Sequence, residues 1–240
     1  MCDGNIEILA KKLREGDVVA FSGAGLSTES GLQDFRSQNG IWKKYDPTRM
    51  ASHEVLTERY DDFIEFYREA LWVPEEIKPN FGHKFIAELE AQGLVLGVIT
   101  QNIDGLHEKA GSKTIAALHG SNEPIICCNC GEIATPEAFF AHKHCVCGGN
   151  LRPSVVLFGE ELPVLALNLA NRLVSKAKTL LVLGSSLTVS PANYFPMAAK
   201  EAGANLIIIN RDPTPLDRCA DLVIHDTIGS MLQEVAALID

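Results

Sequence analysis

Largely apolar runs alternate along most of the chain with segments whose apolar residues recur at helical spacing. Uninterrupted runs are typical of strands covered on both faces of a parallel sheet, and they occur at residues 17–21, 94–100, 114–118, 179–183, 206–210 and 222–224. Helical spacing predicts helices at residues 6–13, 83–92, 163–176, 192–202 and 228–239. The alternation predicts an α/β fold class, a Rossmann-like parallel sheet with helices on both faces.

Two stretches interrupt this rhythm, and both leave from the ends of predicted strands. Residues 32–80 have polar helical patterning, and residues 121–153 hold a cluster of cysteines. Because an open α/β sheet binds ligands at the carboxyl ends of its strands, we expect the insertions to form a small lobe over a cleft. The predicted domains are a large domain (1–31, 81–120 and 154–240), a helical insert (32–80) and a cysteine module (121–153).

Composition and net charge indicate which classes of binding partner are favoured. The 240 residues are 46% hydrophobic and 22% charged, as expected of a globular protein. The 31 acidic and 21 basic side chains give a net charge of −10, which disfavours nucleic acid and membrane surfaces and favours basic peptides. The sequence has no apolar run of the roughly 20 residues that a membrane span needs. We therefore expect a cytoplasmic protein, and a monomer because no heptads are evident.

A glycine turn follows the first predicted strand. Its residues, Gly23, Ala24, Gly25, Leu26 and Ser27, could offer backbone N–H groups to a phosphate at a helix N-terminus. The third glycine of the dehydrogenase fingerprint is replaced by a threonine, and no acidic strand end follows about 20 residues later. A hydride-transferring dehydrogenase is therefore disfavoured, and a turn that merely connects two elements is the alternative.

Polar side chains that could bind a ligand or take part in catalysis follow two of the other predicted strands. Asn102 and Asp104 come after the run 94–100, and such groups can hydrogen-bond ribose hydroxyls or a nicotinamide amide. A structural Asx turn is the alternative for them. His119 follows the run 114–118, which would place an imidazole suited to general-base catalysis at the same edge of the sheet. A purely structural histidine remains the alternative.

The cysteine cluster has the spacing of a metal site. Two closely spaced pairs supply four thiolates, from Cys127, Cys130, Cys145 and Cys147. This donor set fits a tetrahedral structural zinc with no open position for water. The sequence leaves two ligand assignments open. Cys128 could take the place of Cys127, and His142 or His144 could replace a thiolate.

Taken together, six blocks occur in one order: GAGLSTESGLQDFRS (23–37), TQNIDGLH (100–107), HG (119–120), the cysteine pairs, LRP (151–153) with VVLFGE (155–160), and GSSL (184–187). In order and context they resemble the sirtuin family, from about Val18 to the C-terminus. The resemblance implies an NAD-dependent protein lysine deacylase that acts on acyl-lysine proteins or peptides, with a Rossmann-like large domain and a small lobe holding one structural zinc.

The resemblance also assigns roles to residues. It implies that the cofactor NAD is bound by Gly23, Ala24, Gly25, Ser27, Asp34, Phe35, Arg36, Gln101, Asn102, Ile103, Asp104, His119, Gly184, Ser185, Ser186, Asn210 and Ile228. Substrate-binding residues would be Tyr67, Val156, Leu157, Phe158, Gly159 and Glu160. His119 and Asn102 would be catalytic: the acyl oxygen attacks the nicotinamide ribose, nicotinamide leaves, and the histidine activates a ribose hydroxyl toward the resulting imidate.

Departures from the family pattern qualify these expectations. Gln33 stands where a proline is common, and the pair Cys145-x-Cys147 is tighter than the frequent CxxC. Members that favour succinyl or malonyl groups carry Tyr-x-x-Arg, whereas Tyr67 is followed three residues later by Ala70. We therefore expect a preference for acetyl or neutral acyl groups. A protein mono-ADP-ribosyltransferase and a non-catalytic NAD-sensing scaffold remain the alternatives.

Overall fold

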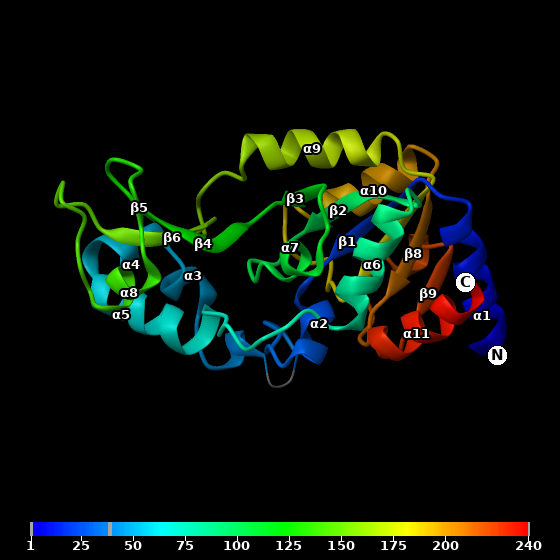
Figure 1. Cartoon of the computed structure of the whole chain (residues 1–240), viewed down its shortest axis with the longest axis horizontal. Helices are drawn as coiled ribbons and strands as arrows, with labels where there is room; N and C mark the ends of the chain where they lie inside the picture. Colours follow the sequence, from blue (N-terminus) through cyan, green and yellow to red (C-terminus); the bar gives the residue numbers. More distant parts are fainter. Residues whose placement is uncertain (1, 38–39, 240) are drawn as a thin grey trace.

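A six-stranded parallel sheet forms the centre of the larger lobe (Figure 1). The computed structural model describes residues 2–37 and 40–239. In spatial order the strands are β3 (Ile115–Ala117), β2 (Val95–Thr100), β1 (Val18–Ser22), β7 (Thr179–Leu183), β8 (Asn205–Ile209) and β9 (Leu222–Ile224). Every neighbouring pair is parallel, as the continuous apolar runs predicted.

Helices cover both faces of this sheet, which confirms the predicted fold class. One face packs against α1 (Cys2–Arg14), α6 (Phe81–Ala91) and α11 (Ile228–Ile239), and the other against α9 (Val164–Val174) and α10 (Tyr194–Glu201). Successive strand residues serve opposite faces. Val18 and Ala20 enter the first core, whereas Val19 and Phe21 enter the second, and all four are fully buried.

The strand order reverses between β1 and β7. From β1 the chain builds outward through β2 and β3, and then returns to place β7 on the other side of β1. In open α/β sheets, ligands bind in the crevice at the carboxyl ends of the strands where the strand order reverses in this way. The glycine turn after β1 and the segment beginning at Gly184 after β7 both lie at this switch point.

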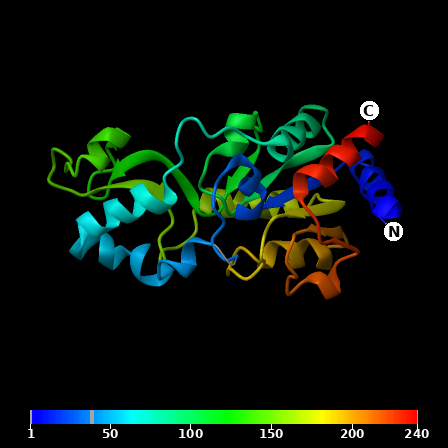
Figure 2. The ribbon, with the colours of Figure 1, turned by 90° about the horizontal axis from the view of Figure 1, so that it is seen from below.

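The smaller lobe contains a three-stranded antiparallel sheet, which lies at the left of Figures 1 and 2. Its strands are β5 (Ile133–Ala134), β4 (Gly120–Cys127) and β6 (Leu151–Val155), and its helices are α3 (Pro47–Met50), α4 (His53–Glu58), α5 (Tyr60–Phe66) and α8 (Pro136–Phe140). A π-helical turn, η3 (Tyr67–Leu71), continues α5. This sheet is not predicted from the sequence, because β4 and β6 each contain a proline, which usually argues against a strand.

The aromatic rings of the inserts form the core of this lobe. Phe63, Phe66, Tyr67 and Phe139 are all at most 2% exposed, and the tilted rings of Phe63 and Tyr67 have centroids 4.6 Å apart. Helices α4 and α5 come from the insert 32–80, whereas α8, β4 and β5 come from the cysteine module. The two inserts therefore share one hydrophobic core.

Short elements connect these parts, and some bounds differ from prediction. They are α2 (Ala24–Ser27), η1 (Thr28–Ser30), η2 (Ile41–Lys43), α7 (Leu106–Ala110) and η4 (Asp217–Cys219). The helix predicted at 163–176 begins at Val164, because Pro163 is its N-cap rather than its first residue.

Among the described residues, no helix has the length and apolar character to cross a membrane.

Candidate active site

Three glycines let the loops after β1 and β7 pack against each other. A Cβ on Gly184 would lie 2.3 Å from the backbone nitrogen of Leu26, and a Cβ on Gly23 would lie 2.8 Å from the carbonyl oxygen of Gly184. Gly23 N–H donates to Leu183 O at 3.0 Å and Gly25 N–H to Gly184 O at 2.9 Å. The N–H groups of these two glycines therefore hold the loops together.

A cavity of about 530 Å³ opens between the two lobes at the carboxyl ends of the sheet. This volume is within the usual range for ligand sites. Most of the predicted cofactor residues line it: Gly23, Ala24, Gly25, Asp34, Phe35, Arg36, Gln101, Asn102, Ile103, His119, Gly184, Ser185, Ser186, Asn210 and Ile228. All six predicted substrate residues line it too, from Tyr67 and from the segment 156–160. The structure thus brings together in one site residues that are far apart in the sequence.

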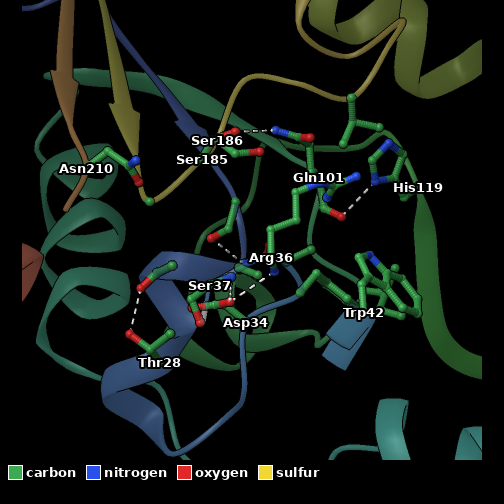
Figure 3. Close-up of a pocket in the computed structure, with 18 of the residues that line it drawn as sticks. Thr28, Asp34, Arg36, Ser37, Trp42, Gln101, His119, Ser185, Ser186 and Asn210 are labelled. Carbon is green, nitrogen blue, oxygen red and sulfur yellow. Dashed lines mark hydrogen bonds between the residues drawn. The ribbon is translucent and has the colours of Figure 1, made fainter. Parts of the chain in front are cut away.

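His119 is held in one tautomer by the backbone (Figure 3). Its Nδ1 lies 2.9 Å from the carbonyl oxygen of Gln101. Because a carbonyl can only accept, Nδ1 carries the proton in the neutral ring and Nε2 keeps its lone pair. Burial lowers the pKa of His119 below 6.5; the bond to Gln101 opposes this shift and the charge of Arg36 adds to it. The imidazole is therefore neutral, and able to accept a proton at Nε2, at neutral pH.

Gln101 and Asn102 connect the loops at the floor of the cavity. The Gln101 side chain donates to Ser185 Oγ at 2.8 Å, across the switch point. The Asn102 amide donates to Gly23 O at 3.2 Å and to Ser27 Oγ at 3.1 Å. Ser27 in turn donates to Asp104 Oδ2 at 2.6 Å. Ser27 and Asp104 are not among the lining residues, so their contacts orient Asn102 from behind the cavity wall.

The four predicted cysteines converge in the smaller lobe. Their sulfur atoms all lie within 4.8 Å of one another, and three of the separations are 3.5, 3.5 and 3.6 Å. Four thiolates around zinc, with Zn–S bonds of about 2.3 Å, have sulfurs roughly 3.8 Å apart. The residues present therefore fit a tetrahedral zinc.

The structure settles the alternative ligands. Cys128 is outside the sulfur cluster. His142 Nδ1 lies 2.6 Å from an Asp61 carboxylate oxygen, and the His144 ring packs against Tyr60 in a tilted arrangement. The cluster is thus the all-cysteine set Cys127, Cys130, Cys145 and Cys147.

Comparisons with known proteins agree with this geometry. The model of the Sir2 family matches residues 23–191. A protein from Oceanobacillus iheyensis called NAD-dependent protein deacetylase is 50% identical over 221 residues, which are 91% of this chain and 94% of that protein. A protein of the same name from Sulfolobus acidocaldarius is 44% identical over 226 residues, 91% of this chain and 88% of that protein.

Solved structures match over nearly the whole chain. A Sir2 protein with a deacetylated p53 peptide and 3'-O-acetyl ADP-ribose has a TM-score of 0.93 at 36% identity, covering 98% of both chains. A Sir2 protein with a p53 peptide and NAD+ has a TM-score of 0.87 at 36% identity, covering 97% of both chains.

The chain belongs to the Sir2 family.

In this Sir2 family member the segment after β6 forms one rim of the cavity. The strand ends at Val155, and beyond it Phe158 forms an isolated parallel bridge with Ser52. Val156 N–H donates to His119 O at 2.8 Å, and Phe158 N–H donates to Ala51 O at 2.9 Å. The segment is therefore fastened both to the loop of the candidate base and to the helical insert.

Two histidines that the sequence analysis missed lie buried beneath the Sir2 site. His107 Nε2 lies 2.8 Å from Ser22 Oγ, and the rings of His83 and His107 meet edge to face at 5.0 Å. Both residues are at most 1% exposed. Burial lowers the pKa of His83 to about 4 and that of His107 to about 3. These groups are neutral in the folded protein at neutral pH.

Other lining residues also escaped the sequence analysis. Trp42 stacks on Phe35 of the predicted cofactor loop with ring centroids 5.0 Å apart, a contact within the insert 32–80. Further lining residues are Thr28, Glu29, Ser37, Leu71, Leu162, Val189, Pro191, Arg211, Asp212, Asp226 and Thr227. Thr28, Glu29 and Ser37 belong to the block 23–37 but were assigned no role. No local motif distinguishes the others, because they reach the cavity only through the packing of the two lobes.

Proposed function

We propose that this Sir2 family member is an NAD-dependent protein lysine deacylase that transfers the acyl group from lysine to ADP-ribose and releases nicotinamide. The observation that carries the proposal is the neutral imidazole of His119, which keeps its lone pair on Nε2. His119 lines a cavity that is also lined by both predicted cofactor loops and by the segment 156–160. The relatives named NAD-dependent protein deacetylase support it.

On the cofactor side, the loops at the switch point would hold the dinucleotide. Ser185, Ser186 and Asn210 would meet its adenosine half, and Asn102 its nicotinamide ribose. Bound NAD would supply an electrophilic ribose carbon with nicotinamide as its leaving group. His119 Nε2 would accept the proton of a ribose hydroxyl, which would make that oxygen a nucleophile toward the acyl carbon. Arg36, a guanidinium that lines the cavity, would attract the diphosphate.

The four cysteines would hold one structural zinc. Cys127, Cys130, Cys145 and Cys147 fill a tetrahedral shell and leave no position for water, so the metal would stabilise the fold of the smaller lobe. We extend the proposal to the domain division expected from the sequence, with a discontinuous large domain, the insert 32–80 and the module 121–153. We also keep a monomer as the proposed state.

On the substrate side, an extended peptide would pair with the rim segment by β-augmentation, which reads little side-chain sequence. The acyl-lysine would enter between Tyr67, Leu71 and Ile103, all of which line the cavity. Tyr67 is 1% exposed and burial raises its pKa, so its hydroxyl stays neutral. The Arg68 guanidinium turns away toward Glu65 and the carbonyl of Phe140. No cation from this turn is therefore placed to pair with an acyl carboxylate.

One assay tests the reaction. The purified protein is incubated with an acetyl-lysine peptide and labelled NAD, and nicotinamide, deacetylated peptide and acetyl-ADP-ribose are measured. We expect equal amounts of the three products and a loss of at least about 100-fold in kcat for His119→Ala, with His142→Ala, outside the cavity, as the control. Label retained on protein without acetyl-ADP-ribose would instead identify an ADP-ribosyltransferase. Full activity of His119→Ala would refute the role of His119 as the general base.

The acyl preference needs a second comparison, with acetyl, butyryl and succinyl versions of one peptide. A charge-assisted hydrogen bond contributes about 1.5–3 kcal/mol, and 1.4 kcal/mol corresponds to tenfold. Because the pocket lacks the arginine partner, we expect kcat/KM for the acetyl peptide to exceed that for the succinyl peptide by roughly tenfold or more. A succinyl peptide that matches or outperforms the acetyl peptide would contradict this preference.

A further inference from the structure

The carboxylate of Glu160 is fully engaged inside the protein, although the residue lines the cavity. Oε1 receives a bond from Arg152 Nη1 at 2.5 Å, and Oε2 receives one from Arg152 Nη2 at 2.9 Å. Oε2 also accepts the backbone N–H of Leu157 at 2.8 Å. The pair is therefore a two-pronged ion pair joined to the backbone of the rim segment.

The pair is partly shielded from solvent. The side chain of Arg152 is 11% exposed and that of Glu160 is 29% exposed. Burial by itself would raise the pKa of Glu160, but the bonds from Arg152 and from Leu157 N–H outweigh it and hold that pKa below its ordinary value. Two-pronged arginine–carboxylate pairs restrict geometry as well as adding energy. Such a pair is suited to fixing the shape of a loop.

Several hydrogen bonds hold the rim segment, residues 155–160, in place. Arg152 Nη2 also donates to Val155 O at 2.6 Å, so one guanidinium grips both ends of the segment 155–160. The N–H groups of Val156, Leu157 and Phe158 donate to His119 O, Glu160 Oε2 and Ala51 O. These three donors are already used, so a substrate strand must pair with the carbonyl groups of the segment or with Gly159 N–H.

We propose that Arg152 and Glu160 are positioning residues for the substrate peptide: their ion pair sets the backbone of residues 155–160, and Glu160 does not read substrate side chains through its charge. The proposal rests on the proposed function for the identity of the peptide. It differs from the expectation that Glu160 itself contacts the substrate. Arg152 belongs to β6 of the smaller lobe, and the pair therefore ties that sheet to the peptide rim.

The test compares Glu160→Gln, Arg152→Lys and the exposed neighbour Glu161→Gln as matched control. Glu160→Gln keeps the size of the side chain but removes its charge and one of its acceptor oxygens. We expect a roughly tenfold higher KM for the peptide in the first two variants, a KM for NAD within about twofold, and a largely retained kcat. The rise in KM should be the same for peptides with a lysine and for peptides with a glutamate beside the acyl-lysine.

A second readout does not depend on turnover. Hydrogen exchange of the Leu157 amide, measured on the free protein by NMR, should accelerate in Glu160→Gln and stay unchanged in Glu161→Gln. An unchanged peptide KM together with unchanged exchange at Leu157 would overturn the proposal. So would a parallel rise in both KM values with a lower urea midpoint, since that pattern marks general destabilisation.

The outcomes separate this inference from the proposed function. If the wild-type protein does not deacylate any peptide, the proposed function fails, and the exchange of Leu157 still decides whether the pair holds the rim. If Glu160→Gln weakens only peptides with a neighbouring lysine, Glu160 reads substrate charge directly and the positioning role is wrong.

Discussion

Acid should destabilise this protein through its two buried histidines. His83 and His107 are neutral in the folded state, with pKa values of about 4 and about 3, because burial penalises the charged imidazole. In the unfolded chain a histidine has a pKa of about 6.5. Both folded values lie below the unfolded one, so the stabilising contribution is complete above pH 6.5 and is lost as the pH falls toward the folded values.

The magnitude follows from these values. At pH 5 an unfolded histidine is almost fully protonated, and each buried histidine then costs about 2 kcal/mol of unfolding free energy relative to pH 7.5. The pair should therefore remove about 4 kcal/mol, a large part of the total stability of a typical domain. Carboxylates and the cysteine site add their own acid sensitivity, so a variant is needed to isolate the histidines.

The assay is urea unfolding of wild type and His107→Gln at pH 7.5 and 5.0, followed by tryptophan fluorescence. Glutamine can place its amide near Nε2, which lies 2.8 Å from Ser22 Oγ, but it does not titrate. We expect the variant to be less stable at pH 7.5 and to lose about 2 kcal/mol less than wild type on acidification. His53→Gln, at an exposed position, controls for removal of a histidine elsewhere. An identical acid loss in wild type and His107→Gln would refute the reasoning.

Three further predictions concern the site and the smaller lobe. Because burial lowers the pKa of His119, the acidic limb of the pH profile of kcat/KM should have its midpoint below 6.5; a midpoint above 6.5 would contradict this. Cys145→Ala should reduce bound zinc from one equivalent per chain, measured by metal analysis, and lower the thermal midpoint, whereas the exposed Cys219→Ala should retain the metal. Gly184→Ala, at a φ of +65° and with its Cβ 2.3 Å from a backbone nitrogen, should cost more than about 2 kcal/mol in urea unfolding; Gly4→Ala, in open space, should be neutral or stabilising.

Local patterning predicted the larger lobe well because the forces that shape it are local or periodic. Strands buried on both faces must be apolar throughout, and the runs at 17–21, 179–183 and 206–210 correspond to the central strands β1, β7 and β8. The strands of the smaller lobe could not be predicted in this way, because two of them contain a proline. Strands β4 and β6 are stabilised by pairing with each other and by packing on aromatic rings from the other insert, neither of which is written in the neighbouring sequence.

The sequence by itself determined the fold class, the family resemblance and a cysteine cluster with the spacing of a metal site, because each depends on residue types at fixed spacings. Only the tertiary structure decided what those residues do to one another. It excluded Cys128, His142 and His144 from the metal cluster. It assigned the N–H groups of Gly23 and Gly25 to loop packing, and it engaged the Glu160 carboxylate with an arginine. The physical reason is that burial, tautomer and hydrogen-bond partner are set by groups that fold into contact from distant parts of the chain.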